Sequence, residues 1–393
     1  MGTLHRPSPA VSFVGRHNSG KTTLLVKVIA ELVSRGLDIG TVKHHGHCDF
    51  DIDYPGKDSF RHRESGSCDT VIVSSIRMAR VTELQEEPSC DEVVASMPDH
   101  DLVIVEGYRQ SGLPVIEVIR RANERDLAAA EEFCAVGSVR GAVPCAVVTD
   151  MDEVAASALE RGMRAFGLDD VEGIADYLVD RFARPAVTVA IQAGGESRRM
   201  GQSKATIPFL GKPLLERIAM RVAPAADELI VTTNEPERLG FLEDLDLKCP
   251  LRLVTDHYAE RGALRGMATA FEAANSPLVA IVACDMVFAS APLIVEEAHI
   301  LHEGHYDAIV PANKFGYEPF HAVYRKDACL PAVHAAIERG MARARDFFDD
   351  VNLGILHRDE LHRAVPEGGC FINVNTPDEL ARIERSIEED GDR

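Results

Sequence analysis

The sequence has 393 residues, of which 46% are hydrophobic and 27% are charged. This composition excludes a disordered or fibrous chain, and domains of roughly 100–200 residues make two domains the first expectation. The formal net charge of −21 and the absence of Trp argue against nucleic-acid binding, which needs a positive surface and uses stacking aromatic rings.

The sequence contains no pattern typical of a membrane span or of a signal peptide. No run approaches the roughly 18 apolar residues of a membrane span, and Met1–Ala10 contains two prolines without an apolar stretch, so we expect no signal peptide. The nine cysteines are odd in number and form no C-x-x-C pair. This usage favours reduced thiols in a cytoplasmic protein over disulfides or a zinc site.

The first half opens with a strand at Val11–Gly15, a glycine-rich turn and an amphipathic helix at Thr22–Ser34. Apolar runs then alternate with helical patterns, as in α/β domains. The further strands are expected at Thr70–Ser74, Leu102–Glu106, Val115–Ile119 and Ala146–Thr149, and the helices at Lys57–Glu64, Cys90–Met97 and Val171–Phe182.

A second strand–turn–helix opening begins at Val187–Ile191 and continues into a helix at Pro213–Val222. Further strands are expected at Glu228–Thr232, Leu251–Val254, Leu278–Ala283, Ala308–Val310 and His321–Tyr324, and helices at Leu264–Ala274, Pro292–His302 and Asp327–Arg339. This rhythm predicts mostly parallel sheets with helices on both faces. We place the domain boundary at Phe182–Pro185, giving domains 1–184 and 185–393, and expect a frayed tail at Ile387–Arg393.

The turn after the first strand reads G-x-x-x-x-G-K-[ST], a P-loop between a strand and a helix. Its backbone N–H groups and the helix N-terminus surround phosphates. Lys21 is expected at the outer phosphates, and the Thr22 hydroxyl at Mg²⁺. The predicted nucleotide-binding residues are Gly15, Asn18, Ser19, Gly20, Lys21, Thr22 and Thr23.

A second Mg²⁺ ligand is expected at the end of the strand Leu102–Glu106. Glu106 precedes a glycine where the chain leaves a buried strand, whereas Asp101 lies at the other end and is interpreted as a turn residue.

The segment from Val42 to Arg63 is rich in His and Asp. Asp49, Asp51 and Asp53 resemble the start of a calcium loop, but the required Gly and Glu are absent, so we reject that reading. A polar switch loop is favoured over metal binding by His44, His45, His47 and Cys48, because no second ligand cluster completes a site. The basic residues Arg61, His62 and Arg63 suit a solvated helix face or an anion contact about equally.

Several strings carry a family resemblance: G-R-H-N-S-G-K-T-T-L-L, V-K-H-H-G-H, D-I-D-Y-P-G-K-D-S-F-R-H-R, V-E-G-Y-R and P-V-I-E-V-I-R. From about Val11 to Arg121 the chain resembles the MobB-type adaptor proteins of molybdopterin-guanine dinucleotide synthesis. The resemblance implies GTP binding, slow hydrolysis, a homodimer formed through this domain and an accessory role. Arg109 stands where the family usually has Lys.

The second glycine-rich turn, Ala193–Lys204, is longer than a dinucleotide-binding turn. Adjacent glycines beside cationic residues suit a triphosphate that loses diphosphate. We expect Arg199 and Lys204 to neutralise the leaving diphosphate, against the alternative of a basic surface loop.

Three polar residues follow strands of the second half. Asp285 lies with Cys284 at the carboxyl end of Leu278–Ala283 and is the expected Mg²⁺ ligand beside the α-phosphate. Asp256 and Asn234 follow two other strands, so all three are expected at one edge of the sheet, where α/β proteins bind ligands. Each residue alone could instead be a cap or a turn residue.

The second half resembles the MobA-type molybdenum-cofactor guanylyltransferases from about Val187 to Ile387. The strings are A-G-G-E-S-R-R-M-G-Q-S-K, L-G-K-P-L-L-E-R, R-G-A-L-R-G-M, A-C-D-M, E-P-F-H-A-V-Y and F-I-N-V-N-T-P-D-E-L. The resemblance implies molybdopterin binding near Asn373 and Asn375. It assigns GTP contacts to Gln192, Ala193, Gly194, Gly195, Lys204, Asn234, Asp256 and Asp285. Gln192 replaces an aliphatic residue, with a contact expected mainly through its backbone, and Ser203 replaces an acidic one.

The sequence therefore predicts two doubly wound α/β domains, a P-loop NTPase domain followed by a Rossmann-like nucleotidyltransferase domain. The predicted reaction transfers GMP from GTP to molybdenum-molybdopterin with Mg²⁺. The alternatives are a cytidylyltransferase on the same cofactor, a sugar-nucleotide transferase, a GTP-switched carrier without transfer activity and a pure P-loop NTPase. Expected partners are molybdoenzyme apoproteins or their chaperones, without nucleic acid or membrane.

Overall fold

The computed structural model describes residues 4–45, 51–194, 203–258, 260, 262–366 and 368–391. The chain forms two compact units. The first unit comprises Pro7–Arg184, and the second unit comprises Pro185–Arg393 together with the N-terminal segment up to Arg6. Among the described residues no helix is both long and apolar enough to cross a membrane.

The N-terminal segment belongs to the second unit through the side chain of Arg6. Its guanidinium donates hydrogen bonds to the carbonyl oxygens of Pro224 and Ala226, both at 3.0 Å, and to Asp227 Oδ1 at 2.9 Å. Leu4 packs against the core of the same unit. The second unit therefore contains residues from both ends of the sequence.

The first unit is built on a six-stranded sheet in the order β2-β5-β1-β6-β7-β8, in which every pair is parallel. Its strands are β1 (Ala10–Gly15), β2 (Ile39–Lys43), β5 (Leu102–Glu106), β6 (Val115–Ile119), β7 (Ala146–Thr149) and β8 (Arg164–Phe166). Its helices are α1 (Lys21–Ser34), α2 (Asp58–Glu64), α3 (Cys90–Ala95), α4 (Glu124–Val136), α5 (Asp152–Glu160) and α6 (Val171–Arg181).

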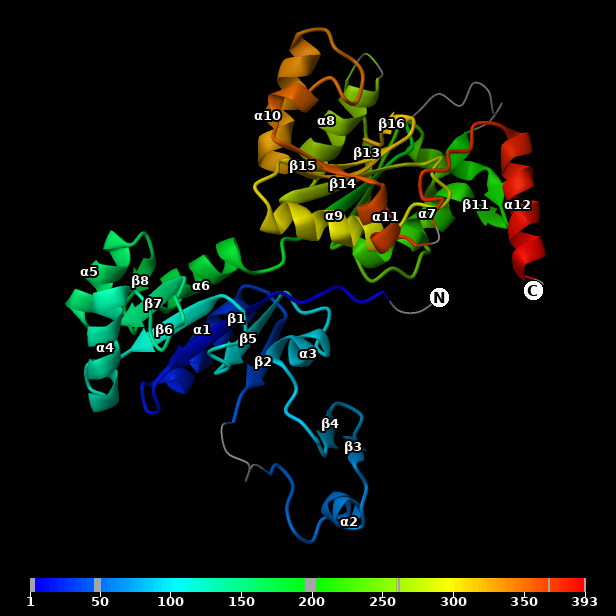
Figure 1. Ribbon diagram of the computed structural model, residues 1–393. Helices are drawn as coiled ribbons and strands as arrows, with labels where there is room; N and C mark the ends of the chain where they lie inside the picture. Colours follow the sequence, from blue (N-terminus) through cyan, green and yellow to red (C-terminus); the bar gives the residue numbers. More distant parts are fainter. Residues whose placement is uncertain are drawn as a thin grey trace. The chain divides into compact units, whose positions relative to one another are not determined.

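Alternation along the strands explains why both faces of this sheet are covered. Leu102 and Ile104 pack with α1 and α6, whereas Val103 and Val105 pack with α3 on the opposite face. Helices α4 and α5 cover the remaining part of that second face (Figure 1). The apolar strands predicted from the sequence are therefore buried on both sides, as parallel sheets require.

One predicted strand lies outside this sheet. β3 (Asp69–Val73) pairs antiparallel with β4 (Met78–Thr82) as an isolated two-stranded hairpin. A turn closed by the Ser74 N–H and the Arg77 carbonyl oxygen, 2.8 Å apart, joins them. The strand expected at Thr70–Ser74 is present, but it lies outside the parallel sheet, because an apolar run indicates a strand without specifying its partner. Figure 1 shows the hairpin and α2 apart from the main sheet of their unit.

The second unit contains an eight-stranded mixed sheet, in the order β13-β12-β9-β14-β17-β15-β16 with β18 also paired to β15. Its strands are β9 (Val187–Gln192), β12 (Glu228–Thr233), β13 (Leu251–Thr255), β14 (Leu278–Ala283), β15 (Ala308–Asn313), β16 (Gly316–Tyr317), β17 (His321–Arg325) and β18 (Leu353–Leu356). β17 is antiparallel to β14 and β15, so the sheet is mixed. A separate two-stranded pair is formed by β10 (Pro208–Phe209) and β11 (Lys212–Pro213).

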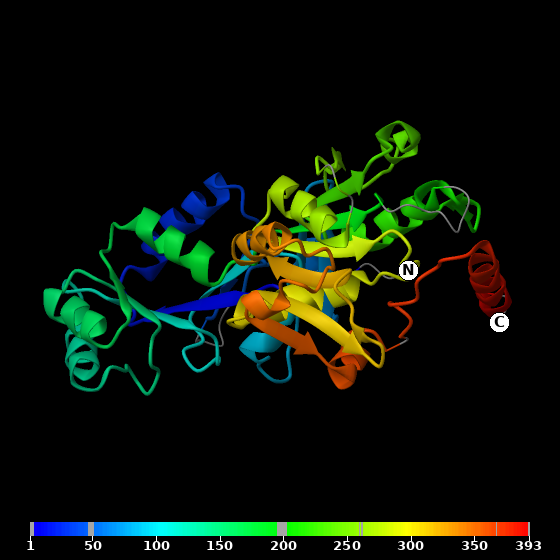
Figure 2. The ribbon, with the colours of Figure 1, turned by 90° about the horizontal axis from the view of Figure 1, so that it is seen from above.

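The helices of the second unit are α7 (Leu214–Val222), α8 (Ala263–Ala273), α9 (Ala291–Glu303), α10 (Lys326–Glu338), α11 (Arg358–Ala364) and α12 (Pro377–Gly391). Helices α8 and α10 bury their apolar faces on one side of the sheet, and α7 and α9 on the other. The predicted frayed tail is wrong up to Gly391, because α12 continues through it. In Figure 2, α12 (red) lies at the margin of this unit.

Candidate functional site

The P-loop of the first unit runs from the end of β1 to the start of α1. Gly15 approaches the next strand closely, since a Cβ atom there would lie 2.6 Å from the Val118 carbonyl oxygen. Asn18 and Gly20 have φ angles of 66° and 82°, and this left-handed backbone turns the chain into α1. The side-chain amide of Asn123 donates to the His17 carbonyl oxygen at 3.1 Å and fixes the loop from α4.

Lys21 folds back across this loop. Its Nζ donates to the carbonyl oxygens of Gly15 at 3.0 Å and Arg16 at 2.7 Å, and to Ser19 Oγ at 3.2 Å. Burial lowers the pKa of Lys21, while the carboxylates of Glu106, Asp126 and Glu117 act in the opposite direction. The ammonium group therefore lies inside the loop, and its contact with the outer phosphates stays a prediction.

The two predicted metal ligands of the first unit are neighbours. Thr22 Oγ1 donates to Glu106 Oε1 at 2.8 Å, and Lys43 Nζ lies 3.4 Å from Glu106 Oε2. A hydroxyl and a carboxylate are oxygen ligands of the kind that Mg²⁺ prefers. Thr23 is exposed on the first turn of α1. Asp101 instead accepts a hydrogen bond from the Asp38 N–H and binds Arg184, at the opposite end of β5.

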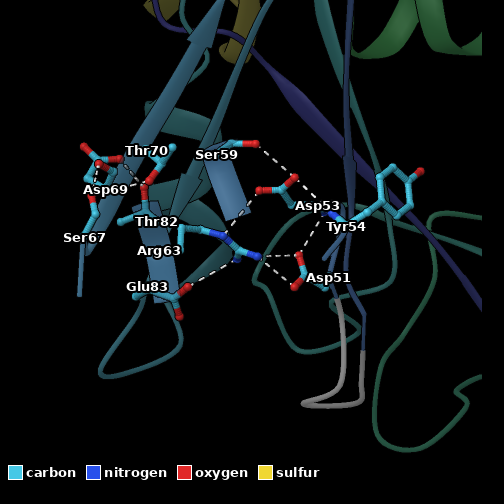
Figure 3. Close-up of polar contacts among 10 residues, drawn as sticks. All are labelled: Asp51, Asp53, Tyr54, Ser59, Arg63, Ser67, Asp69, Thr70, Thr82 and Glu83. Atoms are coloured by element: carbon cyan, nitrogen blue, oxygen red, sulfur yellow. Dashed lines mark hydrogen bonds and ion pairs between the residues drawn. The ribbon is translucent and has the colours of Figure 1, made fainter. Parts of the chain in front are cut away.

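A carboxylate cluster surrounds Arg63 on α2, as Figure 3 shows. The guanidinium donates to both oxygens of Asp51, at 3.0 and 2.8 Å, and lies 3.3 Å from Glu83 and 3.7 Å from Asp53. Ser59 Oγ also donates to Asp53 at 3.1 Å. Arg63 therefore joins α2 to two loop segments. Arg61 and His62 are exposed, which is consistent with their interpretation as a solvated helix face.

The histidine-rich segment is described only in part. His44 Nε2 lies 2.7 Å from Glu87 Oε1, whereas His47, Cys48 and Asp49 fall outside the described residues. Within the described ranges, no group of three or more His, Cys, Asp or Glu side chains is arranged to hold a metal ion.

The second unit has a cavity of about 570 Å³ at the carboxyl ends of β9, β12 and β14. The predicted residues on its wall are Gln192, Gly194, Lys204, Asp256, Asp285 and Asn373. This edge is where open α/β sheets bind ligands. Arg199 and Gly195 lie outside the described residues.

Lys204 and Asp285 meet at this cavity although 81 positions separate them. Lys204 Nζ donates to Asp285 Oδ2 at 2.8 Å and to Asn375 Oδ1 at 3.1 Å. The ammonium and the carboxylate are both largely buried, with side-chain exposures of 18% and 22%. Burial raises the pKa of the adjacent Cys284 thiol to about 12, so this thiol stays protonated.

The other predicted residues hold the edge of the sheet together. Asp256 Oδ1 accepts hydrogen bonds from the Tyr258 N–H and the Thr269 hydroxyl, both at 3.0 Å. Asn234 Nδ2 lies 3.5 Å from the Gly194 carbonyl oxygen. Met286 and Asn373 form an isolated antiparallel bridge, which brings the N-V-N segment to the Asp285 loop.

Several wall residues were not singled out from the sequence. They are Thr232, Thr233, Gly262, Ala263, Gly266, Ala283, Met286, Glu318 and Phe320. The strings R-G-A-L-R-G-M and E-P-F-H-A-V-Y contain five of them, so the signal lay in those strings. Ala193, Asn234 and Asn375 adjoin the cavity without being part of its wall as described.

A buried acid–base pair includes His321, the residue that follows Phe320 of the cavity wall. Glu297 on α9 and His321 on β17 are both fully buried, with Nδ1 and Oε1 3.7 Å apart. His321 Nε2 accepts a hydrogen bond from the Ser290 N–H at 2.9 Å, so its ring proton is on Nδ1. Burial lowers the pKa of His321 to about 4 and raises the pKa of Glu297 well above its ordinary value.

Comparison with known proteins assigns both units. The family model of molybdopterin guanine dinucleotide synthesis protein B (MobB) matches residues 10–138, and the MobA-like NTP transferase domain matches residues 189–355. A molybdopterin-guanine dinucleotide biosynthesis adapter protein of Escherichia coli is 32% identical over 179 residues, covering 44% of this chain and 92% of that protein. A probable molybdenum cofactor guanylyltransferase of Carboxydothermus hydrogenoformans is 32% identical over 200 residues, covering 50% of this chain and 94% of that protein.

The chain belongs to the MobB family in its first unit and to the MobA-like NTP transferase family in its second. The second unit is therefore a nucleotidyltransferase domain. A crystal structure of molybdopterin-guanine dinucleotide biosynthesis protein A from Archaeoglobus fulgidus is also similar, with 22% identity and a TM-score of 0.45. The match covers 51% of this chain and 99% of the Archaeoglobus fulgidus chain.

Proposed function

We propose that the second unit transfers GMP from GTP to molybdenum-molybdopterin, forming molybdopterin guanine dinucleotide and diphosphate. The observation that carries this proposal is the Lys204–Asp285 pair on the wall of the cavity, in a domain of the MobA-like NTP transferase family. Relatives of this unit are named molybdenum cofactor guanylyltransferases.

The proposed reaction is an in-line displacement at phosphorus. An oxygen of the terminal phosphate of molybdopterin forms a bond to the α-phosphorus of GTP, and the bond from that phosphorus to the bridging oxygen breaks. The bridging oxygen keeps the electron pair and leaves with diphosphate. The attacking group is already an anion, so the protein contributes positioning and charge neutralisation.

Each residue has a separate proposed role. Lys204 gives up its contact with Asp285 and neutralises the leaving diphosphate, with Arg199 as its proposed helper. Asn373 and Asn375 position molybdopterin. Asp285 is the proposed holder of Mg²⁺, for which its partly exposed carboxylate at the cavity is suited. The ion, when bound, supplies positive charge beside the phosphates.

The test uses the purified full chain with molybdenum-molybdopterin, Mg²⁺ and GTP, CTP or ATP in parallel. We expect diphosphate and dinucleotide with GTP, and loss of both on Asp285→Asn. The matched control is Asp327→Asn, an exposed carboxylate on the first turn of α10. Product with CTP alone would reassign the base, and bound molybdopterin without diphosphate would indicate a carrier.

We propose further that the first unit binds GTP and Mg²⁺ at its P-loop. The hydrogen bonds of Lys21 to the loop carbonyl oxygens and the hydrogen bond between Thr22 and Glu106 support this assignment. The test is binding of a fluorescent GTP analogue to the Asp285→Asn chain, with and without Lys21→Met. Binding that survives Lys21→Met unchanged would remove the P-loop assignment.

We also propose that the first unit forms a homodimer through the hairpin β3–β4. Its residues Val71, Ile72, Val73, Ile76 and Met78 are exposed, from 47% to 84%. Such a patch on an unpaired edge favours association. Light scattering after gel filtration should detect a dimer that Ile76→Asp converts to a monomer. Val136→Asp, on the exposed end of α4, is the control.

The compartment and the partners are also proposals. The eight described cysteines are all free thiols, which supports a reducing cytoplasm. We propose molybdoenzyme apoproteins or their chaperones as recipients of the product. Retention of the full chain on an immobilised apoenzyme, compared with the cofactor-loaded form, tests this partner.

A further inference from the structure

Gln192 presents a buried side-chain amide at the nucleotide cavity. It is the last residue of β9 and part of the cavity wall. Its Nε2 atom is buried and has no hydrogen-bond partner in the described part of the chain. Buried polar groups are almost always hydrogen-bonded, since leaving a donor unpaired costs its desolvation energy. An unpaired donor on the wall of a ligand cavity indicates that the ligand supplies the acceptor.

A glycine on the adjacent helix α8 leaves room for this amide. Gly266 lies on the second turn of α8, and a Cβ atom there would come 2.4 Å from Gln192 Oε1 and 3.3 Å from its Cδ. Glycine is unfavourable inside a helix, so close approach explains its presence. The amide oxygen is therefore the side-chain atom closest to α8, while Nε2, 3.6 Å from the same point, has no hydrogen-bond partner in the described part of the chain.

Gln192 and Lys204, which is proposed to bind the phosphates, belong to opposite faces of the sheet. Ala190, two residues earlier on β9, packs in the core cluster of α8, so Gln192 is on that face too. Lys204 comes from the 3₁₀ turn Lys204–Thr206, which lies against α7 on the opposite face. Among the described wall residues Lys204 is the one with a positive charge. A triphosphate held at Lys204 and Asp285 leaves the neutral wall of Thr232, Gly262 and Gly266 for the base.

We propose that the Gln192 side-chain amide donates a hydrogen bond to O6 of guanine and is thereby a specificity-determining residue of this chain. The inference rests on the proposed guanylyltransferase function and deepens it. Guanine presents two acceptors, O6 and N7, on one edge, whereas adenine presents a donor amino group beside N7. Because N7 is an acceptor in both bases, a donor favours guanine only where it reaches O6, at which position adenine has a second donor. A leucine at the same position makes no such distinction.

The experiment compares GTP with two analogues on the full chain. One is 7-deaza-GTP, which lacks N7, and the other is 2-aminopurine riboside triphosphate, which lacks O6. We expect the analogue that lacks O6 to lose roughly 10-fold in kcat/KM with the wild-type chain, the size expected for one hydrogen bond. Gln192→Leu should lose a similar factor with GTP and show no further loss with that analogue. Gln85→Leu, at an exposed position in the first unit, is the matched control.

Gly266→Ala supplies a second variant that displaces the amide through contact. It should reduce kcat/KM for GTP when Gln192 is present, and have little further effect in a Gln192→Ala background. Equal analogue profiles for the wild-type chain and Gln192→Leu would overturn the proposal, as would additive losses in the double variant.

A binding measurement separates this proposal from the proposed function. GTP and both analogues are titrated calorimetrically into the Lys21→Met chain, in which the P-loop of the first unit is disabled. Affinity loss for the analogue without O6 that disappears on Gln192→Leu supports the contact even if no dinucleotide forms. Equal affinities for GTP and both analogues in the chain with Gln192 intact would overturn the contact even if transfer is observed.

Discussion

Removing the guanidinium of Arg109 should destabilise the first unit strongly, because it leaves Glu117 alone in the core. Both guanidinium NH groups of Arg109 bind the carboxylate of Glu117, one at 2.8 Å, and Glu117 is only 1% exposed. Burial raises the pKa of Glu117, while the charge and hydrogen bonds of Arg109 lower it. Losing one partner of a buried ion pair typically costs about 3–5 kcal/mol.

The matched comparison is the exposed pair Arg80–Asp69, whose side chains are 63% and 39% exposed. Exposed ion pairs contribute about 0–1 kcal/mol. We therefore expect Arg109→Met to lower the free energy of unfolding of the first unit by about 3–5 kcal/mol, and Arg80→Met by less than about 1 kcal/mol. Arg109→Lys keeps the charge without the paired donors and should fall between them.

Urea unfolding followed by far-UV circular dichroism gives the stability, and hydrogen exchange of β5 and β6 peptides assigns the change to the first unit. In the Arg109→Met background, Glu117→Gln should recover part of the loss at neutral pH because it removes the buried charge. A cost of Arg109→Met near that of Arg80→Met, or no recovery in the double variant, would refute the reasoning.

Three further outcomes follow from other contacts. Thr22→Val should weaken Mg²⁺-dependent GTP binding by the first unit by at least about 10-fold, and transfer activity of the Thr22→Val chain with saturating GTP should stay unchanged. The pKa of Glu297 is raised on folding, so the unfolding free energy of the second unit should fall as pH rises above 4.5 through the folded pKa, and Glu297→Gln should flatten this decline in a urea titration series. Burial lowers the pKa of His321, so the unfolding free energy of the second unit also falls as the pH drops from 6.5 through about 4. This fall is expected in the wild-type chain and in Glu297→Gln alike. Gly15→Ala should destabilise the first unit by about 1–3 kcal/mol through a contact 2.6 Å from a backbone carbonyl of β6, whereas Gly167→Ala meets nothing within 4 Å, and thermal melts compare the two.

Local residue chemistry was sufficient to predict the strand–turn–helix segment that begins each half of the chain. The strand–glycine–helix order around Gly20 and Lys21 predicts both the turn and the helix, because each requirement is met within a few residues. The strand Leu278–Ala283 and the placement of Asp285 after it were predictable for the same reason. These features depend on hydrophobic periodicity and backbone conformation, which a short window of sequence contains.

Contacts between distant segments needed the tertiary structure. The hairpin β3–β4 could not be separated from the main sheet, since a strand pattern does not name its partner. Arg63 reads as basic surface in sequence, yet three carboxylates from two segments bind it or lie beside it. The antiparallel placement of β17 likewise depends on the path of the chain between strands.

The sequence by itself determined two α/β domains, the P-loop, the glycine-rich turn of the second unit and the family of each. The tertiary structure decided which side chains meet: Lys204 with Asp285, Arg109 with Glu117, and the Gln192 amide with Gly266. Turns and helix starts are set by interactions within a few residues, whereas the packing of a helix on a sheet is set by the whole core. The environment of Gln192 is therefore visible only after β9 and α8 are placed together.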